Sequence, residues 1–161
     1  MKYIILIKLL FPMSSWPETS QEKSWETYRQ YLTKEYISSL FGKYNELFMS
    51  MLPITTAESV TASHIDAISK STLKAGELRA VIDNIDLANS YFKVYQVNEC
   101  SFIGMTLEVG VIQMNLPSLK SCIAEQCDNL FIPHEKIKLL SVALNEKVGV
   151  CFRELSPKEN N

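Results

Sequence analysis

Glycine and histidine are scarce in this sequence, whose 161 residues include 5 Gly and 2 His. No Gly-x-Gly-x-x-Gly, P-loop, Gly-x-Ser-x-Gly or His-Glu-x-x-His motif occurs. These motifs form phosphate-binding loops, the nucleophile elbow of hydrolases and a zinc site, so the sequence offers no support for those sites. We predict no catalytic residues, no metal site and no cofactor, and we expect a binding protein rather than an enzyme.

Clustered positive charge and long apolar runs are also missing. The formal net charge is −2, and no two residues of like charge are adjacent. Nucleic acid is not expected as a partner, because phosphate binding depends on concentrated Lys and Arg. No apolar run reaches the roughly 18 residues of a membrane-spanning helix, which argues against a multi-span membrane protein. The composition, 47% hydrophobic and 21% charged, is that of a globular chain long enough for one domain.

Four cysteines, Cys100, Cys122, Cys127 and Cys151, invite both a disulfide and a metal interpretation. Cys122, Cys127 and His134 form C-x4-C-x6-H, which is not a standard zinc spacing. On one continuous helix, at about 100° per residue, the two sulfurs would lie about 140° apart. A chain of this size also needs no disulfide to fold. We therefore predict free, buried or half-buried thiols and a cytoplasmic protein.

The beginning of the chain has two interpretations. Lys2 and the apolar run at 3–11 begin like a signal peptide, but Lys8 interrupts the run and no Ala-x-Ala-like cleavage site follows. We favour a first strand that ends before Pro12; membrane attachment through 3–11 is a less favoured hypothesis. The opening Met-Lys-Tyr-Ile-Ile-Leu-Ile segment resembles the start of ferredoxin-like dimeric α/β-barrel proteins such as the YCII-like group. The helices predicted after it depart from that group's βαββ order, so no site residue is carried over.

A long helical region follows and ends before Pro53. Its apolar face shifts by about a third of a turn, at about 100° per residue, between 25–36 and 37–51. Such a shift requires either a break near 38–42 or cover on two sides. Part of this aromatic face can meet a partner, because Trp and Tyr are enriched in interface hot spots. The predicted partner-binding residues are Tyr36, Phe41, Tyr44 and Phe48, and burial in the chain's own core is the alternative.

The rest of the sequence predicts a mixture of helices and strands. A Thr55–Glu58 capping box and an apolar stripe predict helices to about residue 72 and over 74–89, the second with an exposed Arg79–Asp83 pair. Between Cys100 and Leu119 the one charge is Glu108, so we expect this interval to be largely buried. Period-two alternation predicts strands, and the remaining apolar patterns predict helices. The strands are expected at 91–97, 102–114 and 148–155, and the helices at 117–129 and 135–145.

Together with the strand at 3–11, this pattern predicts an α+β fold. A small, mainly antiparallel sheet is packed with about five helices. It forms a single domain over 1–155, with a flexible tail at 156–161.

The mild acidity, the missing motifs and the aromatic excess favour a non-catalytic protein-binding module. A toxin-neutralising immunity protein or a secretion-chaperone-like adaptor would fit this description. The partner would be another protein, and a homodimer is an open alternative. A second hypothesis is a small-molecule binder or cofactor-independent enzyme with a pocket between sheet and helices. That pocket would be lined by Tyr91, Tyr95, Phe102 and Cys151.

Overall fold

A computed structural model of the chain describes residues 20–92 and 102–155, with side chains described over 34–87 and 102–153. Helices make up nearly all of these residues. The helices are α2 (Ser20–Thr55), α3 (Ile65–Phe92), α4 (Phe102–Ala124) and α5 (Phe131–Leu155), and a short 3-10 turn, η1 (Ala62–His64), precedes α3.

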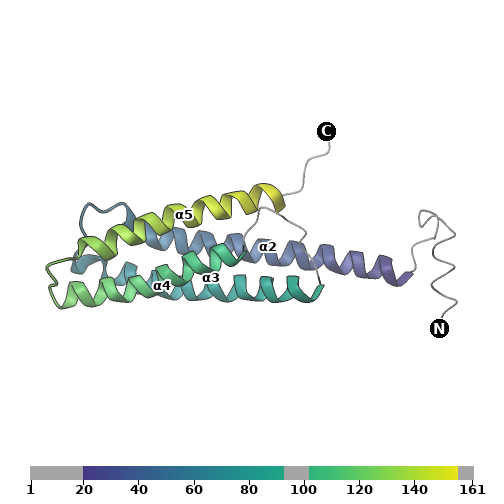
Figure 1. The fold of residues 1–161 in the computed structure, drawn as a ribbon, viewed down its shortest axis with the longest axis horizontal. Helices are drawn as coiled ribbons and strands as arrows, with labels where there is room; N and C mark the ends of the chain where they lie inside the picture. Colours follow the sequence, from purple (N-terminus) through teal and green to yellow (C-terminus); the bar gives the residue numbers. More distant parts are fainter. Residues whose placement is uncertain (1–19, 93–101, 156–161) are drawn as a thin grey trace, which may run out of the picture.

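The four long helices lie side by side, each antiparallel to the next along the chain (Figure 1). Helices α2 and α4 each contact both α3 and α5, so the order around the bundle follows the order in the sequence. Short connections between antiparallel neighbours are typical of an up-and-down four-helix bundle. Helix α2 is the longest, and its first turns extend beyond the ends of the other three helices (Figure 1).

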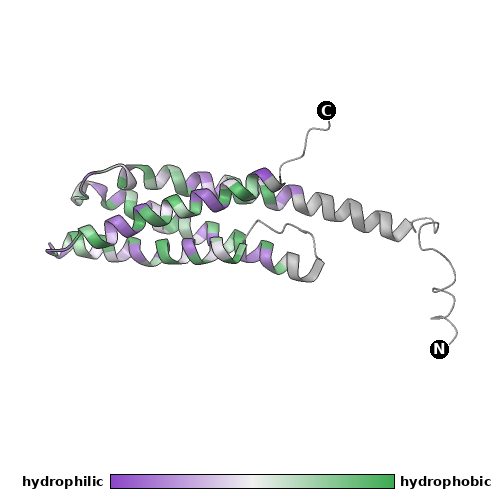
Figure 2. Ribbon diagram, turned by 45° about the horizontal axis from the view of Figure 1, so that its top comes forward, coloured by the Kyte–Doolittle hydropathy of each residue, from purple (hydrophilic) through white to green (hydrophobic). Residues whose placement is uncertain are grey.

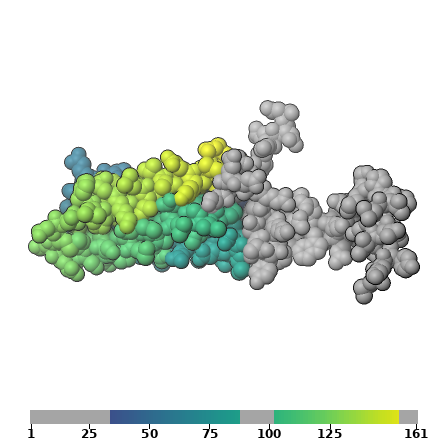
Figure 3. Space-filling model, viewed as in Figure 1, coloured from purple at the N-terminus to yellow at the C-terminus, as the bar shows by residue number. Residues whose placement is uncertain are grey.

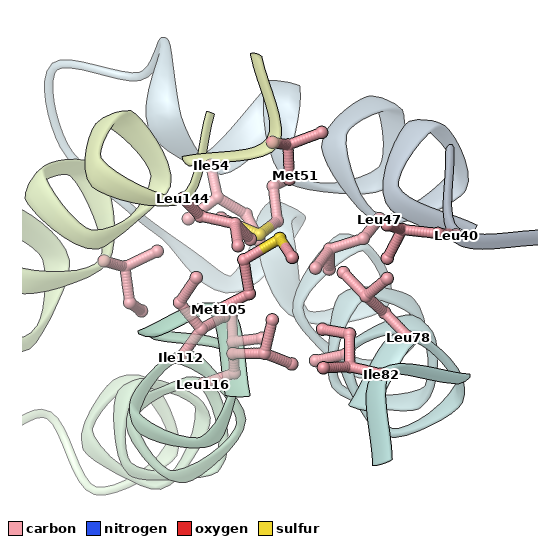
Figure 4. Packing of buried hydrophobic residues seen from close by; sticks show 14 of the residues in the cluster. Leu40, Leu47, Met51, Ile54, Leu78, Ile82, Met105, Ile112, Leu116 and Leu144 are labelled. Atoms are coloured by element: carbon pink, nitrogen blue, oxygen red, sulfur yellow. The ribbon is translucent and has the colours of Figure 1, made fainter. Parts of the chain in front are cut away.

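The core fills the space between the helices and draws on all four of them (Figure 4). Helix α4 shows the pattern most clearly, because its buried residues recur every three or four positions, the spacing of one helix face. Hydrophobic and hydrophilic residues are therefore interspersed along the helices, because each helix has a side that faces the core and a side that does not (Figure 2). The fully buried large side chains are Leu40, Leu47, Met51, Ile54, Ile68, Leu78, Ile82, Ile85, Met105, Ile112, Leu116 and Leu119.

The predicted α+β fold is wrong, because the described residues contain no strand. The segment 102–114 lies in α4 and 148–155 lies in α5, while 3–11 and 93–97 are outside the described residues. Alternating apolar residues at 107, 109 and 111 suggested a strand, but the same segment also buries Phe102, Met105, Val109 and Ile112 at helical spacing. Burial of that helical face outweighs the β-propensity of the valines, since propensity is weaker than tertiary context.

Proline and capping signals also misplaced helix boundaries. Pro53 and Pro117 instead lie inside α2 and α4, both at exposed positions. Helix α2 continues without a break through the region 38–42, so cover by both α3 and α5 explains its wide apolar face. The capping box forms at Thr61 and His64, not at Thr55 and Glu58: His64 Nδ1 accepts from the Thr61 N–H at 3.1 Å.

Other predictions agree with the structure. In α3, Leu78, Ile82 and Ile85 are buried, and Arg79 pairs with Asp83 across 3.9 Å on the exposed side. The predicted tail at 156–161 is outside the described residues.

Candidate functional site

The structure places the four predicted partner-binding residues on α2, all of them half-buried. Phe41, Tyr44 and Phe48 lie toward α5. The ring of Phe41 packs edge-on against Phe152 with centroids 4.9 Å apart, and the Tyr44 and Phe48 rings lie 6.0 Å apart. Tyr36 lies about 80° around the helix from Tyr44, at about 100° per residue, and does not join this group.

Tyr44 links α2 to α5 through its hydroxyl group, which donates to Asn145 Oδ1. Burial raises the pKa of the Tyr44 phenol above its ordinary value, because a phenolate would lose hydration there. The hydroxyl therefore stays protonated and able to donate at neutral pH. These contacts give the aromatic residues a role in the seam between two helices, and their exposed edges remain on the surface.

Several exposed large apolar side chains lie on α5, next to this seam. We call Phe131, Ile132, Leu139 and Val142 the α5 surface; their exposed fractions lie between 60% and 70%. Ile132, Leu139 and Val142 are seven and three residues apart, and at about 100° per residue they share one side of the helix. Large apolar side chains on one side of a helix, outside its core, suggest a surface that another molecule covers.

Sequence reasoning missed this surface, because it assigned 148–155 to a strand and saw only the buried stripe of 135–145. The signal was present in the spacing. Ile137, Leu144 and Val148 are buried, whereas Ile132, Leu139 and Val142 repeat on the opposite side. A helix that is apolar on both sides either lies inside a larger assembly or meets a partner.

Helix α4, which packs against α5 (Figure 3), also carries exposed apolar side chains. Ile103, Leu107 and Met114 are exposed by 68%, 64% and 66%. The prediction that the interval around Glu108 is largely buried is therefore only half correct: one side of α4 faces the core, and the other is apolar and exposed. Glu108 forms a hydrogen-bonded ion pair with Lys147, which joins α4 to α5.

The seam between α2 and α3 is charged instead. Lys43 and Lys74 each pair with both Glu46 and Glu77, at distances between 2.7 and 3.1 Å. Hydrogen bonding to the lysines lowers the pKa of both carboxyl groups, with Lys74 dominant for Glu46 and Lys43 for Glu77. The same bonds raise the pKa of both lysines. The bundle thus carries a charged cluster along the α2–α3 seam, whereas the α5 surface is apolar.

The described cysteines are disulfide-bonded in the structure, whereas free thiols were predicted. Cys122 and Cys127 form a disulfide with Cα atoms 5.0 Å apart, and Cys151 is also disulfide-bonded. The free-thiol prediction is wrong because it assumed one continuous helix through both residues. Helix α4 ends at Ala124, and Gln126 has a φ of 54°, which turns the chain back so that the two sulfurs meet.

The histidines have structural contacts. His134 is buried, and its Nε2 donates to the Ile54 carbonyl oxygen at 2.7 Å, so it closes the end of α2. The next residue, Glu135, pairs with Lys138 at 3.0 Å. Among the side chains described, over 34–87 and 102–153, no group of three or more His, Cys, Asp and Glu is arranged to hold a metal ion.

The alternative pocket between a sheet and helices has no sheet to form it within the described residues. Of its expected lining, Phe102 and Cys151 are buried in the bundle core. Tyr91 belongs to α3, and Tyr95 is outside the described residues.

Among the helices described, none combines the length and the apolar character needed to cross a membrane. Comparison with known proteins found no matching family model, no matching curated protein and no matching solved structure.

Proposed function

We propose that this four-helix bundle is a non-catalytic protein-binding module that engages its partner through the α5 surface. The observation that carries the proposal is the exposure of Phe131, Ile132, Leu139 and Val142, each at 60% or more, on a helix whose opposite side is already packed. Soluble proteins seldom leave large contiguous apolar patches uncovered, and such patches commonly mark interaction sites.

The partner that fits best is a protein presenting an amphipathic helix. Ile132, Leu139 and Val142 have the spacing with which one helix packs along another, and such docking uses anchors at helical intervals. The half-exposed rings of Phe41 and Phe48 border this line on the α2 side and supply aromatic contacts typical of hot spots.

Charges beside the α5 surface suggest how the partner helix is oriented. Lys136 and Glu146 are both exposed, and ten residues of helix separate them by about 15 Å. A partner with an acidic residue near Lys136 and a basic residue near Glu146 would complement them. Such rim charges govern orientation and association rate more than affinity.

The cysteine pairing bears on where this binding takes place. Disulfides persist in oxidising compartments and are rare in the cytoplasm. The Cys122–Cys127 disulfide therefore supports a working environment that is oxidising, in place of the cytoplasm expected from the sequence.

Site-specific photo-cross-linking tests the proposal. A benzophenone amino acid replaces Leu139 in the full chain expressed in its source cells, and the matched control carries it at Leu73, which is 62% exposed on α3. We expect a discrete protein adduct from position 139 that disappears when Val142→Lys is added, and none from position 73. Equal adducts from both positions, or none from position 139, would contradict the proposal. An adduct of twice the chain mass would identify a second copy as the partner.

A further inference from the structure

The end of α4 has the hydrogen-bond pattern of a Schellman motif. The Cys127 N–H donates to the Cys122 carbonyl oxygen at 3.0 Å, and the Gln126 N–H donates to the Ile123 carbonyl oxygen at 3.4 Å. Between these bonds Gln126 adopts the left-handed conformation, with a φ of 54°. This combination satisfies carbonyl groups that the end of a helix would otherwise leave without a donor.

Glutamine is an unfavourable residue at this position. The left-handed site of a Schellman motif is usually glycine, because a side chain with a Cβ atom is strained there. Gln126 is the only residue other than glycine with a positive φ in the described part of the chain. Something other than its own preference must hold it in this conformation.

The disulfide joins the two positions that hold the motif together. In a Schellman motif, the residue whose N–H makes the long bond often contacts the residue whose carbonyl accepts it. Here these residues are Cys127 and Cys122, and the usual apolar contact is replaced by a covalent bond with Cα atoms 5.0 Å apart. The bond restrains Gln126, which lies inside the closed loop.

The turn between α4 and α5 leads directly into the α5 surface. Helix α5 begins at Phe131, four residues after Cys127, and its first turn carries the exposed Phe131 and Ile132 and the buried His134. Cys122 and Cys127 are partly exposed, so a reductant can reach them. Cys151 is fully buried in the core.

We propose that the Cys122–Cys127 disulfide is a redox-sensitive clamp that fixes the α4–α5 corner and with it the first turn of α5. Its effect on partner binding rests on the proposed function of the α5 surface, whereas its effect on the corner does not. Opening uses a dithiol reductant: one thiolate attacks a sulfur of the pair to give a mixed disulfide, and the second thiolate displaces it. Two electrons and two protons pass to the chain, which ends with two thiols while the reductant ends as a disulfide.

Hydrogen exchange measured by mass spectrometry tests the clamp in the full chain. The variant C122S/C127S is compared with the wild type under oxidising conditions, which leave Cys151 bonded. We expect exchange at the Gln126 and Cys127 amide positions, and through the first turn of α5, to become about tenfold faster or more, with the centre of α3 unchanged. Unchanged exchange over 125–134 would overturn the proposal.

A rescue separates loss of the clamp from general damage. Adding Gln126→Gly to C122S/C127S supplies a residue that adopts the left-handed conformation without strain, so we expect most of the protection to return. Failure of glycine to restore protection would mean that the disulfide does not act through Gln126. If C122S/C127S does not fold, mild dithiol reduction of the wild type and of Gln126→Gly gives the same comparison, and the wild type should lose more protection.

The effect of opening the disulfide on partner binding is measured as the yield of adducts from photo-cross-linkers placed at Ile132 and at Leu139. When the clamp is opened, we expect the adduct at position 132 to fall several-fold while that at position 139 is largely retained. If exchange protection is lost while the adducts at both positions are unchanged, the claim that the disulfide controls partner binding is overturned. If the wild type with its disulfide formed gives no adduct at either position, the proposed function is wrong. The hydrogen-exchange measurement still decides whether the disulfide holds the turn.

Discussion

His134 donates a hydrogen bond through Nε2 to the carbonyl oxygen of Ile54, 2.7 Å away, and joins the first turn of α5 to the last turn of α2. Both residues are buried, so water cannot replace this donor. The carbonyl of Ile54 is one of those that the end of a helix leaves without a partner. A side chain far along the chain therefore completes the end of α2.

Replacing His134 with Phe keeps an aromatic ring and removes the donor. We expect a loss of about 1–3 kcal/mol in the free energy of unfolding, because a buried acceptor is left unpaired. Urea unfolding followed by circular dichroism measures it. Ile132→Ala, at an exposed position in the same turn, is the control and should change stability by no more than about 0.5 kcal/mol. Equal effects of the two substitutions would show that the hydrogen bond contributes nothing specific.

A buried hydroxyl pair between α2 and α3 predicts unequal costs for two similar substitutions. Ser71 Oγ donates to Ser50 Oγ at 3.0 Å, and Ser50 Oγ donates to the Leu47 carbonyl oxygen at 2.7 Å. Ser50→Ala leaves the Ser71 hydroxyl without its acceptor, whereas Ser71→Ala leaves Ser50 bonded. We expect Ser50→Ala to cost about 1 kcal/mol more than Ser71→Ala in chemical unfolding. The reverse order would contradict this hydrogen-bond direction.

The charge network between α2 and α3 predicts a loss of stability in acid. Hydrogen bonds from the lysines lower the pKa of Glu46 and Glu77 in the folded state. Their contribution is present above the unfolded pKa of about 4.3 and is lost as the pH falls through the lower folded values. In urea unfolding at pH 7 and pH 3, E46Q/E77Q should therefore lose less stability on acidification than the wild type. High salt should shrink the difference, because these groups are near solvent.

Two helical glycines should respond differently to alanine. A Cβ at Gly42 would meet no atom within 4 Å, whereas a Cβ at Gly76 would lie 3.3 Å from Gln113 Nε2 on α4. Gly42→Ala should gain about 1 kcal/mol from helix propensity alone. Gly76→Ala should gain less, since Gln113 must move. Thermal unfolding of the two variants checks the order, and a loss of stability at Gly42 would contradict an exposed, uninterrupted helix there.

The burial and hydrogen bond of Tyr44 predict that the folded state loses stability at alkaline pH. Burial raises the pKa of this phenol, so its contribution to stability is complete below the unfolded pKa of about 10 and is lost as the pH rises through the folded value. Tyr44→Phe removes this dependence together with the bond to Asn145. The wild type should thus lose more stability than Tyr44→Phe between pH 9 and pH 11, values chosen to bracket an ordinary phenol at about 10.

The sequence was sufficient for local properties that depend on near neighbours. It predicted the buried stripe of α3 with Leu78, Ile82 and Ile85, and the Arg79–Asp83 pair, because these follow from helical spacing. It also directed attention to Phe41, Tyr44 and Phe48, which the structure brings to one seam beside the α5 surface. These residues share a side of one helix, so their grouping needs no knowledge of the rest of the fold.

The sequence by itself thus determined which segments could be helical, which faces were apolar and where charge was scarce. Only the tertiary structure decided that 102–114 and 148–155 are helical rather than extended, since burial against neighbouring helices outweighs the β-propensity of Val109 and Val148. It also decided that Cys122 meets Cys127, because the turn at Gln126 reverses the chain. Finally, it decided which of the two apolar sides of α5 is buried and which is left uncovered, since exposure depends on the neighbours that the folded chain supplies.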